Sequence, residues 1–238
     1  MEDFERYGDY NDLDDAPKSK NTVLIIIKVL ITLVILFVVG ILAFRIILFN
    51  YYPKNIKEIY FNDTLTEYYN STDGEIGALT QELRAPYDDA KLGNFMADNL
   101  IVIKGADQLQ ISIRCNRSVL KQIQTDYGVD VELGEDAFSF ELYRDPRVDS
   151  EDGEELVPEK IGHLTYCEYD SMSMYSYYKL VFDGVDFEDG SDEAVEWIRV
   201  EITINGVEME KPYMIPIYEN HSGYSKLDDY KLSGGEQP

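Results

Sequence analysis

Residues Val23 to Phe49 read VLIIIKVLITLVILFVVGILAFRIILF, and this apolar run divides the chain into a short head and a long body. Its uncharged part, Val29 to Phe44, would be about 24 Å long as a helix at 1.5 Å per residue. The whole run is longer than the roughly 30 Å of hydrocarbon in a bilayer. Lys28 and Arg45 lie near its ends, where long cationic side chains reach the headgroups. We therefore predict one transmembrane helix over residues 23–49, with the lipid bilayer as its partner.

A cleaved signal peptide is the rival interpretation of this run. Signal peptides have apolar regions of about 7 to 15 residues that end in small residues at the cleavage site. Here Ala43 is preceded by Ile41 and followed by Phe44 and Arg45, so no such site is present. The pattern favours an uncleaved, single-pass signal-anchor.

The bases that flank the run bear on its direction, because cytoplasmic flanks carry an excess of Lys and Arg. The bases nearest the run are Arg6, Lys18, Lys20 and Lys28 on the N-terminal side, and Arg45, Lys54 and Lys57 on the C-terminal side. This small excess predicts a cell-membrane protein with its N-terminus in the cytoplasm and its C-terminal domain outside.

Charge and composition separate the remaining parts of the chain. The 238 residues include 46 acidic and 21 basic ones, which gives a formal net charge of −25. Such a surface repels phosphate backbones, so we predict no nucleic-acid partner. Residues 1–22 form a predicted disordered acidic tail and residues 219–238 a polar tail, whereas residues 50–218 keep regularly spaced apolar side chains and are predicted to fold as one extracytoplasmic domain. The oligomeric state is left open.

Alternating apolar residues predict strands in this domain. Leu109, Ile111, Ile113 and Cys115 alternate with Gln110, Ser112 and Arg114, as in a half-buried strand. The other predicted strands are residues 56–61, 99–104, 138–142, 164–168, 177–182 and 197–205. Asn205-Gly206 predicts a hairpin turn, and Pro216 places the returning strand at a sheet edge.

Two short helices are predicted among these strands. Residues 118–128 have a helical apolar face between Ser118, a candidate N-cap, and Gly128, a candidate stop. Ile76, Leu79 and Leu83 also have helical spacing. The predicted fold class is mainly β: one N-terminal transmembrane helix and an antiparallel, immunoglobulin-like β-sandwich with one or two short helices.

Cys115 and Cys167 are the two cysteines of the chain and form a candidate disulfide. Trp197 follows the second cysteine instead of lying between the two, unlike the immunoglobulin pattern. Cys167 is also out of phase with Leu164 and Tyr166. A disulfide and two free, partly buried thiols are both compatible with the sequence.

No catalytic residue and no cofactor is predicted. Ser118-Val119-Leu120-Lys121 matches S-x-x-K, but the S-D-N and K-T-G motifs of that enzyme family are missing from the sequence. His163 and His221, the two histidines, belong to no zinc motif. Calcium is a weaker hypothesis than a solvated acidic loop for one acidic stretch, whose candidate ligands are Asp186, Glu188, Asp189 and Asp192.

Four segments of the chain resemble a group of uncharacterised single-pass membrane proteins of anaerobic Gram-positive bacteria. They are FERYGDY at 4–10, FNYYPK at 49–54, YYKLVFDGVDF at 177–187 and WIRVEI at 197–202. The resemblance implies a bacterial envelope setting, carries no assigned activity and favours free thiols.

These observations predict a membrane-anchored extracytoplasmic β-domain that is not an enzyme. It would bind an unknown protein or envelope partner, or help to organise the envelope. The alternative is a cell-envelope hydrolase that uses paired carboxylates, which no sequence motif would reveal.

Overall fold

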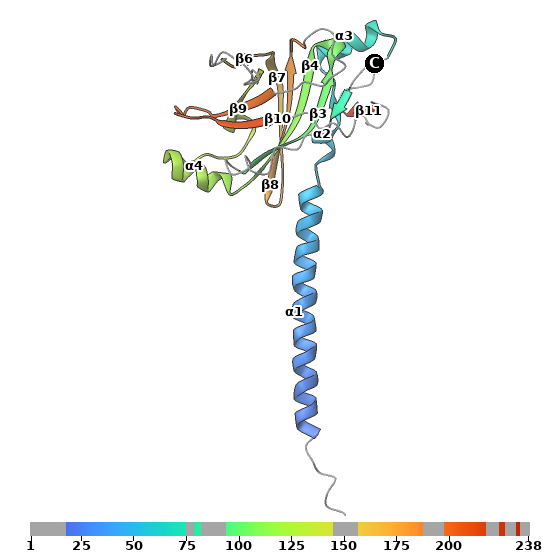
Figure 1. The fold of residues 1–238 in the computed structure, drawn as a ribbon, viewed down its shortest axis with the longest axis vertical. Helices are drawn as coiled ribbons and strands as arrows, with labels where there is room; N and C mark the ends of the chain where they lie inside the picture. The colour runs from blue at the N-terminus through green and yellow to red at the C-terminus, as the bar shows by residue number, and fades with distance from the viewer. Residues whose placement is uncertain are drawn as a thin grey trace, which may run out of the picture. The chain divides into compact units, whose positions relative to one another are not determined.

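The computed structural model describes residues 18–74, 79–81, 94–144, 157–187, 198–217, 224–226 and 232–233. The chain divides into two compact units, Met1–Tyr51 and Tyr52–Pro238. The first unit contains helix α1, Lys18–Asn50 (Figure 1). Within the described residues, α1 provides one segment, Thr22–Leu48, that is long and apolar enough to cross a membrane. Since α1 begins at Lys18, the predicted disordered tail ends earlier than residue 22, and its first 17 residues lie outside the described part.

The second unit is mainly β, with few helices and two larger antiparallel sheets. The six-stranded sheet has the order β11-β2-β3-β4-β8-β7, and the four-stranded sheet has the order β10-β9-β5-β6. The bounds in the first sheet are β2 Leu79–Gln81, β3 Phe95–Ile103, β4 Gln108–Asn116, β7 His163–Met172, β8 Tyr175–Asp183 and β11 Tyr224–Lys226. Those in the second are β5 Phe138–Arg144, β6 Glu159–Lys160, β9 Ile198–Ile204 and β10 Tyr213–Ile217. Short helical elements and a parallel strand pair complete the unit: α2 Lys54–Lys57, β1 Ile59–Tyr60, α3 Asp63–Ser71, η2 Lys104–Ala106, α4 Val119–Tyr127, η3 Glu135–Ala137 and β12 Leu232–Ser233, which pairs with β1.

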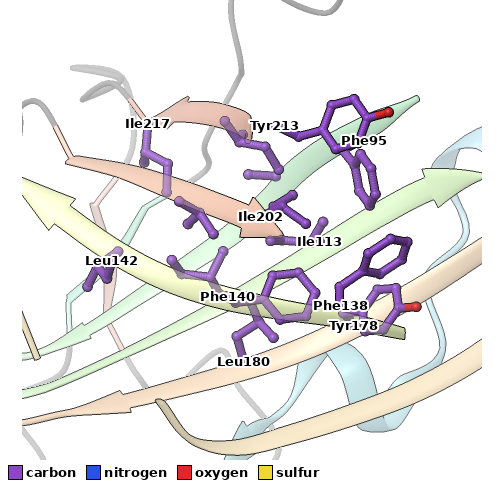
Figure 2. Close-up of a cluster of buried hydrophobic side chains, with 14 of the residues drawn as sticks. Phe95, Ile113, Phe138, Phe140, Leu142, Tyr178, Leu180, Ile202, Tyr213 and Ile217 are labelled. Carbon is purple, nitrogen blue, oxygen red and sulfur yellow. The ribbon is translucent and has the colours of Figure 1, made fainter. Parts of the chain in front are cut away.

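The inner faces of the two larger sheets share one hydrophobic core. Figure 2 shows Ile113, Tyr178 and Leu180 of the six-stranded sheet beside core residues of the four-stranded sheet. Aromatic rings make part of this contact: the ring centroids of Phe95 and Phe138 are 5.2 Å apart, edge to face. Such pairs stabilise a core beyond the area that they bury. Strands β5 and β9 bury every second residue in this core, as predicted from the alternation of apolar and polar residues in their sequences.

Strand β4 differs from the prediction of a half-buried strand. Its polar residues Gln108, Gln110, Ser112 and Arg114 are buried as well as its apolar ones. The segment that follows α1 covers them, because α2, β1 and α3 pack on the outer face of the six-stranded sheet through hydrogen bonds to β4 and β8. The sheet is therefore enclosed on both faces at its centre.

Three further predictions meet the structure differently. The helix proposed from Ile76, Leu79 and Leu83 is wrong where it is described, because Leu79–Gln81 is a strand paired with β3. The strand predicted over residues 56–61 is reduced to the two-residue β1, because the residues before it belong to α2. Pro53, which directly precedes α2, favours a helix start. The C-terminal region contributes β11 and β12, whereas a polar tail was expected. The helix at 118–128 and the edge position of the strand with Pro216 are confirmed.

Candidate functional site

A buried polar interface holds the segment after α1 against the six-stranded sheet. The Gln110 side chain accepts from the Tyr60 amide at 2.9 Å and donates to the Tyr60 carbonyl at 2.7 Å. The Ser112 hydroxyl donates to the Ile56 carbonyl at 2.7 Å. Three backbone groups of the segment are thus bonded to side chains of β4, so Gln110 and Ser112 are buried polar residues with partners in the segment that covers them.

Asp183, at the end of β8, anchors the next part of the segment. Its carboxylate accepts from the side-chain amide of Asn62 at 2.6 Å and from that of Gln108 at 2.7 Å. Asn62 is also the N-cap of α3, since its side chain accepts from the Leu65 amide at 3.0 Å. One carboxylate thus fixes both the sheet and the start of the helix that covers it.

Lys179 lies in the middle of this interface and is fully buried. Among the described residues its Nζ has no hydrogen-bond partner. Its cross-strand neighbours are Ser112 in β4 and Glu168 in β7. Glu168 is engaged elsewhere, because Asn55 donates to it at 2.6 Å and Tyr166 at 3.1 Å. Burial lowers the pKa of Lys179 to about 7, and the negative charge of Glu168 only partly opposes this fall.

Tyr52, at the start of the second unit, is surrounded by aromatic and basic groups. Its ring lies 5.1 Å from that of Tyr177, edge to face. The Arg114 guanidinium is 5.3 Å and the Lys57 ammonium 5.4 Å from the centre of the Tyr52 ring. Arg114 also lies 4.9 Å from the ring of Tyr175. Cations over aromatic faces are attracted by the ring quadrupole, so these contacts hold Tyr52, the first residue of the unit, in place.

A pair of carboxylates lies on the outer face of the four-stranded sheet. Glu141 in β5 and Glu201 in β9 are directly opposite each other in the ladder, so their side chains share one face. Lys160 and Tyr143 both donate to Glu141, and these bonds lower the pKa of the Glu141 carboxyl. The same carboxylate raises the pKa of Tyr143 to about 12. Glu141 is therefore held in its ionised form.

The two cysteines are free thiols on neighbouring parts of one sheet. Cys115 is in β4 and Cys167 in β7, and β8 runs between these strands. In β8 their partners are Ser176 and Leu180, so the two thiols are also offset along the strands. Adjacent strands are about 4.8 Å apart, which puts two strands that flank a third beyond the reach of a disulfide. Burial raises the pKa of each thiol to about 12.

The other candidate residues from the sequence are only partly described by the structure. Asp186 is exposed after β8, and its carbonyl accepts from Arg144; Glu188, Asp189 and Asp192 lie outside the described residues. No group of three or more His, Cys, Asp or Glu side chains in the described ranges could hold a metal ion. His163 is exposed in β7, and His221 lies outside those ranges. Ser118 precedes α4 as expected, but its hydroxyl donates to Asn94 at 2.8 Å instead of capping the helix.

Comparisons of the chain with protein-family models, with curated proteins and with solved structures find no significant match.

Neither the polar interface nor the surroundings of Tyr52 could be predicted from the sequence. In the sequence, the residues of these sites are separated by long intervals: Gln110 and Tyr60 are 50 positions apart. The one local signal was the set of polar residues that alternate in β4, and this pattern equally predicts contact with water.

Proposed function

We propose that the chain is a single-pass membrane protein whose β-domain lies outside the cytoplasm and binds a protein or envelope partner without catalysis. The resemblance to single-pass proteins of Gram-positive anaerobes supports a bacterial envelope as the setting.

The observation that carries this proposal is the exposure of helix α1. Its large apolar side chains are between 43% and 69% exposed from Val23 to Ile47. Each such side chain costs roughly 1.5–3 kcal/mol when it stays in water instead of an apolar medium. A lipid bilayer is the surrounding that removes this cost along a whole helix.

The absence of catalysis is supported by the use of the buried polar groups. Asp183, Gln108, Gln110 and Ser112 are each bonded to the segment after α1, so they serve the fold. A domain of this kind presents surface to a partner, and the outer face of the four-stranded sheet offers one such surface, on which Glu141 and Lys160 are exposed and paired.

We also propose the immunoglobulin-like sandwich as the architecture of the domain. Two antiparallel sheets with a common core support it. The likeness does not extend to the cysteines, because Cys115 and Cys167 lie in one sheet, whereas the immunoglobulin disulfide joins two sheets.

Protease treatment of intact cells or spheroplasts tests the direction of the anchor. We expect digestion of the β-domain in intact spheroplasts. A domain that is cut only after lysis contradicts the proposal.

Photo-crosslinking in the native membrane tests the binding role. A photoreactive residue at Ser139 samples the outer face of the four-stranded sheet, and one at Gln124 samples the exposed side of α4. We expect a discrete adduct from one position and not from the other, which would also map the binding face. No discrete adduct from either position contradicts a binding role for both surfaces.

The hydrolase alternative has one favouring observation, the facing pair Glu141 and Glu201. Paired-carboxylate glycosidases need one carboxyl group that keeps its proton as the general acid. Glu141 has the opposite shift, since Lys160 and Tyr143 stabilise its ionised form. The test is the release of reducing sugar from envelope polysaccharide. If the wild-type chain releases sugar and both Glu141→Gln and Glu201→Gln abolish the release, the hydrolase is favoured over the binder.

A further inference from the structure

The basic groups around Tyr52 continue into the tip of the β7–β8 hairpin. Arg114 lies over both Tyr52 and Tyr175, and Tyr175 begins β8 directly after the tip. The Arg117 amide donates to the Met174 carbonyl at 2.9 Å, so Arg117 lies beside the tip. We call this group the Tyr52 cluster; it consists of Tyr52, Lys54, Lys57, Arg114, Arg117 and the hairpin tip Met172–Tyr175.

The cluster is positively charged in a strongly acidic chain. Among the described residues, its four cations have three acids near them: Glu58, which is buried and pairs with Lys54 at 3.5 Å; Glu168, which accepts from Asn55; and Asp170, which is opposite Tyr177 in the ladder. The chain as a whole has a formal net charge of −25. A local excess of cations in such a protein marks a surface that attracts anions while the rest repels them.

The cluster also exposes the groups that suit a lipid surface. The Lys54 side chain is 78% exposed and Met172 is 39% exposed. Arg117 and Ser173 are exposed as well. Cations with methionine and tyrosine side chains beside them match an interface where charged headgroups meet apolar chains.

The position of Tyr52 in the sequence indicates that the cluster's partner is the membrane surface. Only Phe49, Asn50 and Tyr51 separate it from Leu48, the last residue of the candidate span. We propose that the Tyr52 cluster binds anionic lipid headgroups at the membrane surface and thereby docks the domain on the bilayer. This inference rests on the proposed anchor and adds a second, electrostatic contact to it.

Hydrogen exchange on the full chain in nanodiscs tests the inference. Discs of phosphatidylcholine are compared with discs that also contain phosphatidylglycerol, and exchange is followed in peptides that cover Met172–Tyr175. One cation near an anionic surface contributes about 1 kcal/mol, equivalent to about a fivefold change. We expect exchange at the hairpin tip to be at least about fivefold slower in the anionic discs, and this difference to disappear in high salt.

Single substitutions assign the effect to the cluster. Arg117→Gln and Lys57→Gln should each reduce the difference between the discs, while Lys211→Gln, which removes an exposed lysine of the β9–β10 connection, should leave it unchanged. Thermal unfolding in phosphatidylcholine discs checks that the variants are folded.

Three results overturn the inference. The first is equal exchange at the hairpin tip in both kinds of disc, and the second is a Lys211→Gln variant that reduces the difference between the discs as much as the cluster variants do. The third is slowing of exchange to the same extent when glycerol phosphate is added to phosphatidylcholine discs. A chain that does not enter discs at all contradicts the anchor instead.

Discussion

Replacing Lys179 by methionine should stabilise the domain. Lys179 is fully buried, its Nζ lacks a hydrogen-bond partner among the described residues, and the acid opposite it in β7, Glu168, is bonded to Asn55 and Tyr166. Lys179→Met keeps an unbranched apolar stem at this buried position and removes the amine. The change therefore takes away a desolvation cost and breaks no hydrogen bond within the described part of the chain.

The pKa of Lys179 sets the size of the effect. Its fall from 10.5 to about 7 corresponds to about 5 kcal/mol at 1.36 kcal/mol per unit. Replacements of buried ionic groups by apolar ones stabilise proteins by about 1–4 kcal/mol. We expect a gain of about 1–4 kcal/mol in the free energy of unfolding at pH 6, where the cost is present in full.

The pH dependence gives a second signature. Between the folded pKa of about 7 and the ordinary lysine pKa of 10.5, the unfolded state binds more protons than the native state, so wild-type stability rises with pH. The rise expected from pH 6 to 8.5 is about 2 kcal/mol, and Lys179→Met should lack it. The comparison stops at pH 8.5 because of the two thiols, whose pKa values are raised from 9.0 to about 12 in the folded state. Above pH 9 the unfolded state loses thiol protons that the folded state keeps, so the free energy of unfolding falls with pH.

Urea unfolding of the full chain in detergent micelles, followed by tyrosine and tryptophan fluorescence, measures both effects. Lys121→Met is the matched control, because Lys121 is exposed on α4, and its change should stay within about 0.5 kcal/mol. A destabilised Lys179→Met variant, or one that keeps the wild-type rise with pH, would refute the reasoning.

Three further outcomes follow from the same interfaces. Gln110→Leu should cost about 2 kcal/mol in urea unfolding, because it removes the side chain to which both the amide and the carbonyl of Tyr60 are bonded; an unchanged midpoint would contradict the interface. The Cys115 thiol, buried and with its pKa raised to about 12, should resist a thiol reagent at pH 8 until urea is added; rapid labelling of the folded chain would show an open core. Gly105→Ala should destabilise by about 1 kcal/mol, since the added Cβ would lie 2.1 Å from the Tyr68 hydroxyl and the half-buried Tyr68 ring would have to move, whereas Gly134→Ala meets nothing within 4 Å and should be tolerated; equal melting temperatures for the two variants would count against this packing.

Local patterns predicted much of the β-domain. Alternation located β5 and β9, because each buries one face against a shared core. The prediction was wrong at Leu79, where the helical spacing of apolar residues suggested a helix but the chain pairs as a strand with β3. Pairing with a partner distant in the sequence cannot be recognised from the local pattern. The pattern also misjudged β4, whose polar residues read as solvent-facing although other parts of the chain cover them.

The candidate sites were less predictable than the fold. The Tyr52 cluster combines residues near position 52 with others near 114 and 174, so no window of sequence contains it. The free state of Cys115 and Cys167 depends on strand order, because an intervening strand separates two thiols that sequence spacing alone would allow to pair.

The polar interface also orders events during synthesis. Asn62 and its partner Asp183 are 121 residues apart, and Gln110 lies between them. At about 5–20 residues per second, the ribosome needs on the order of ten seconds to reach Asp183 after Asn62 has been made. The part of the domain made first is therefore fixed only after β8 has been completed. Until then its backbone groups must be bonded to water or a chaperone, which makes this interval the one in which the nascent domain is most open to misassembly.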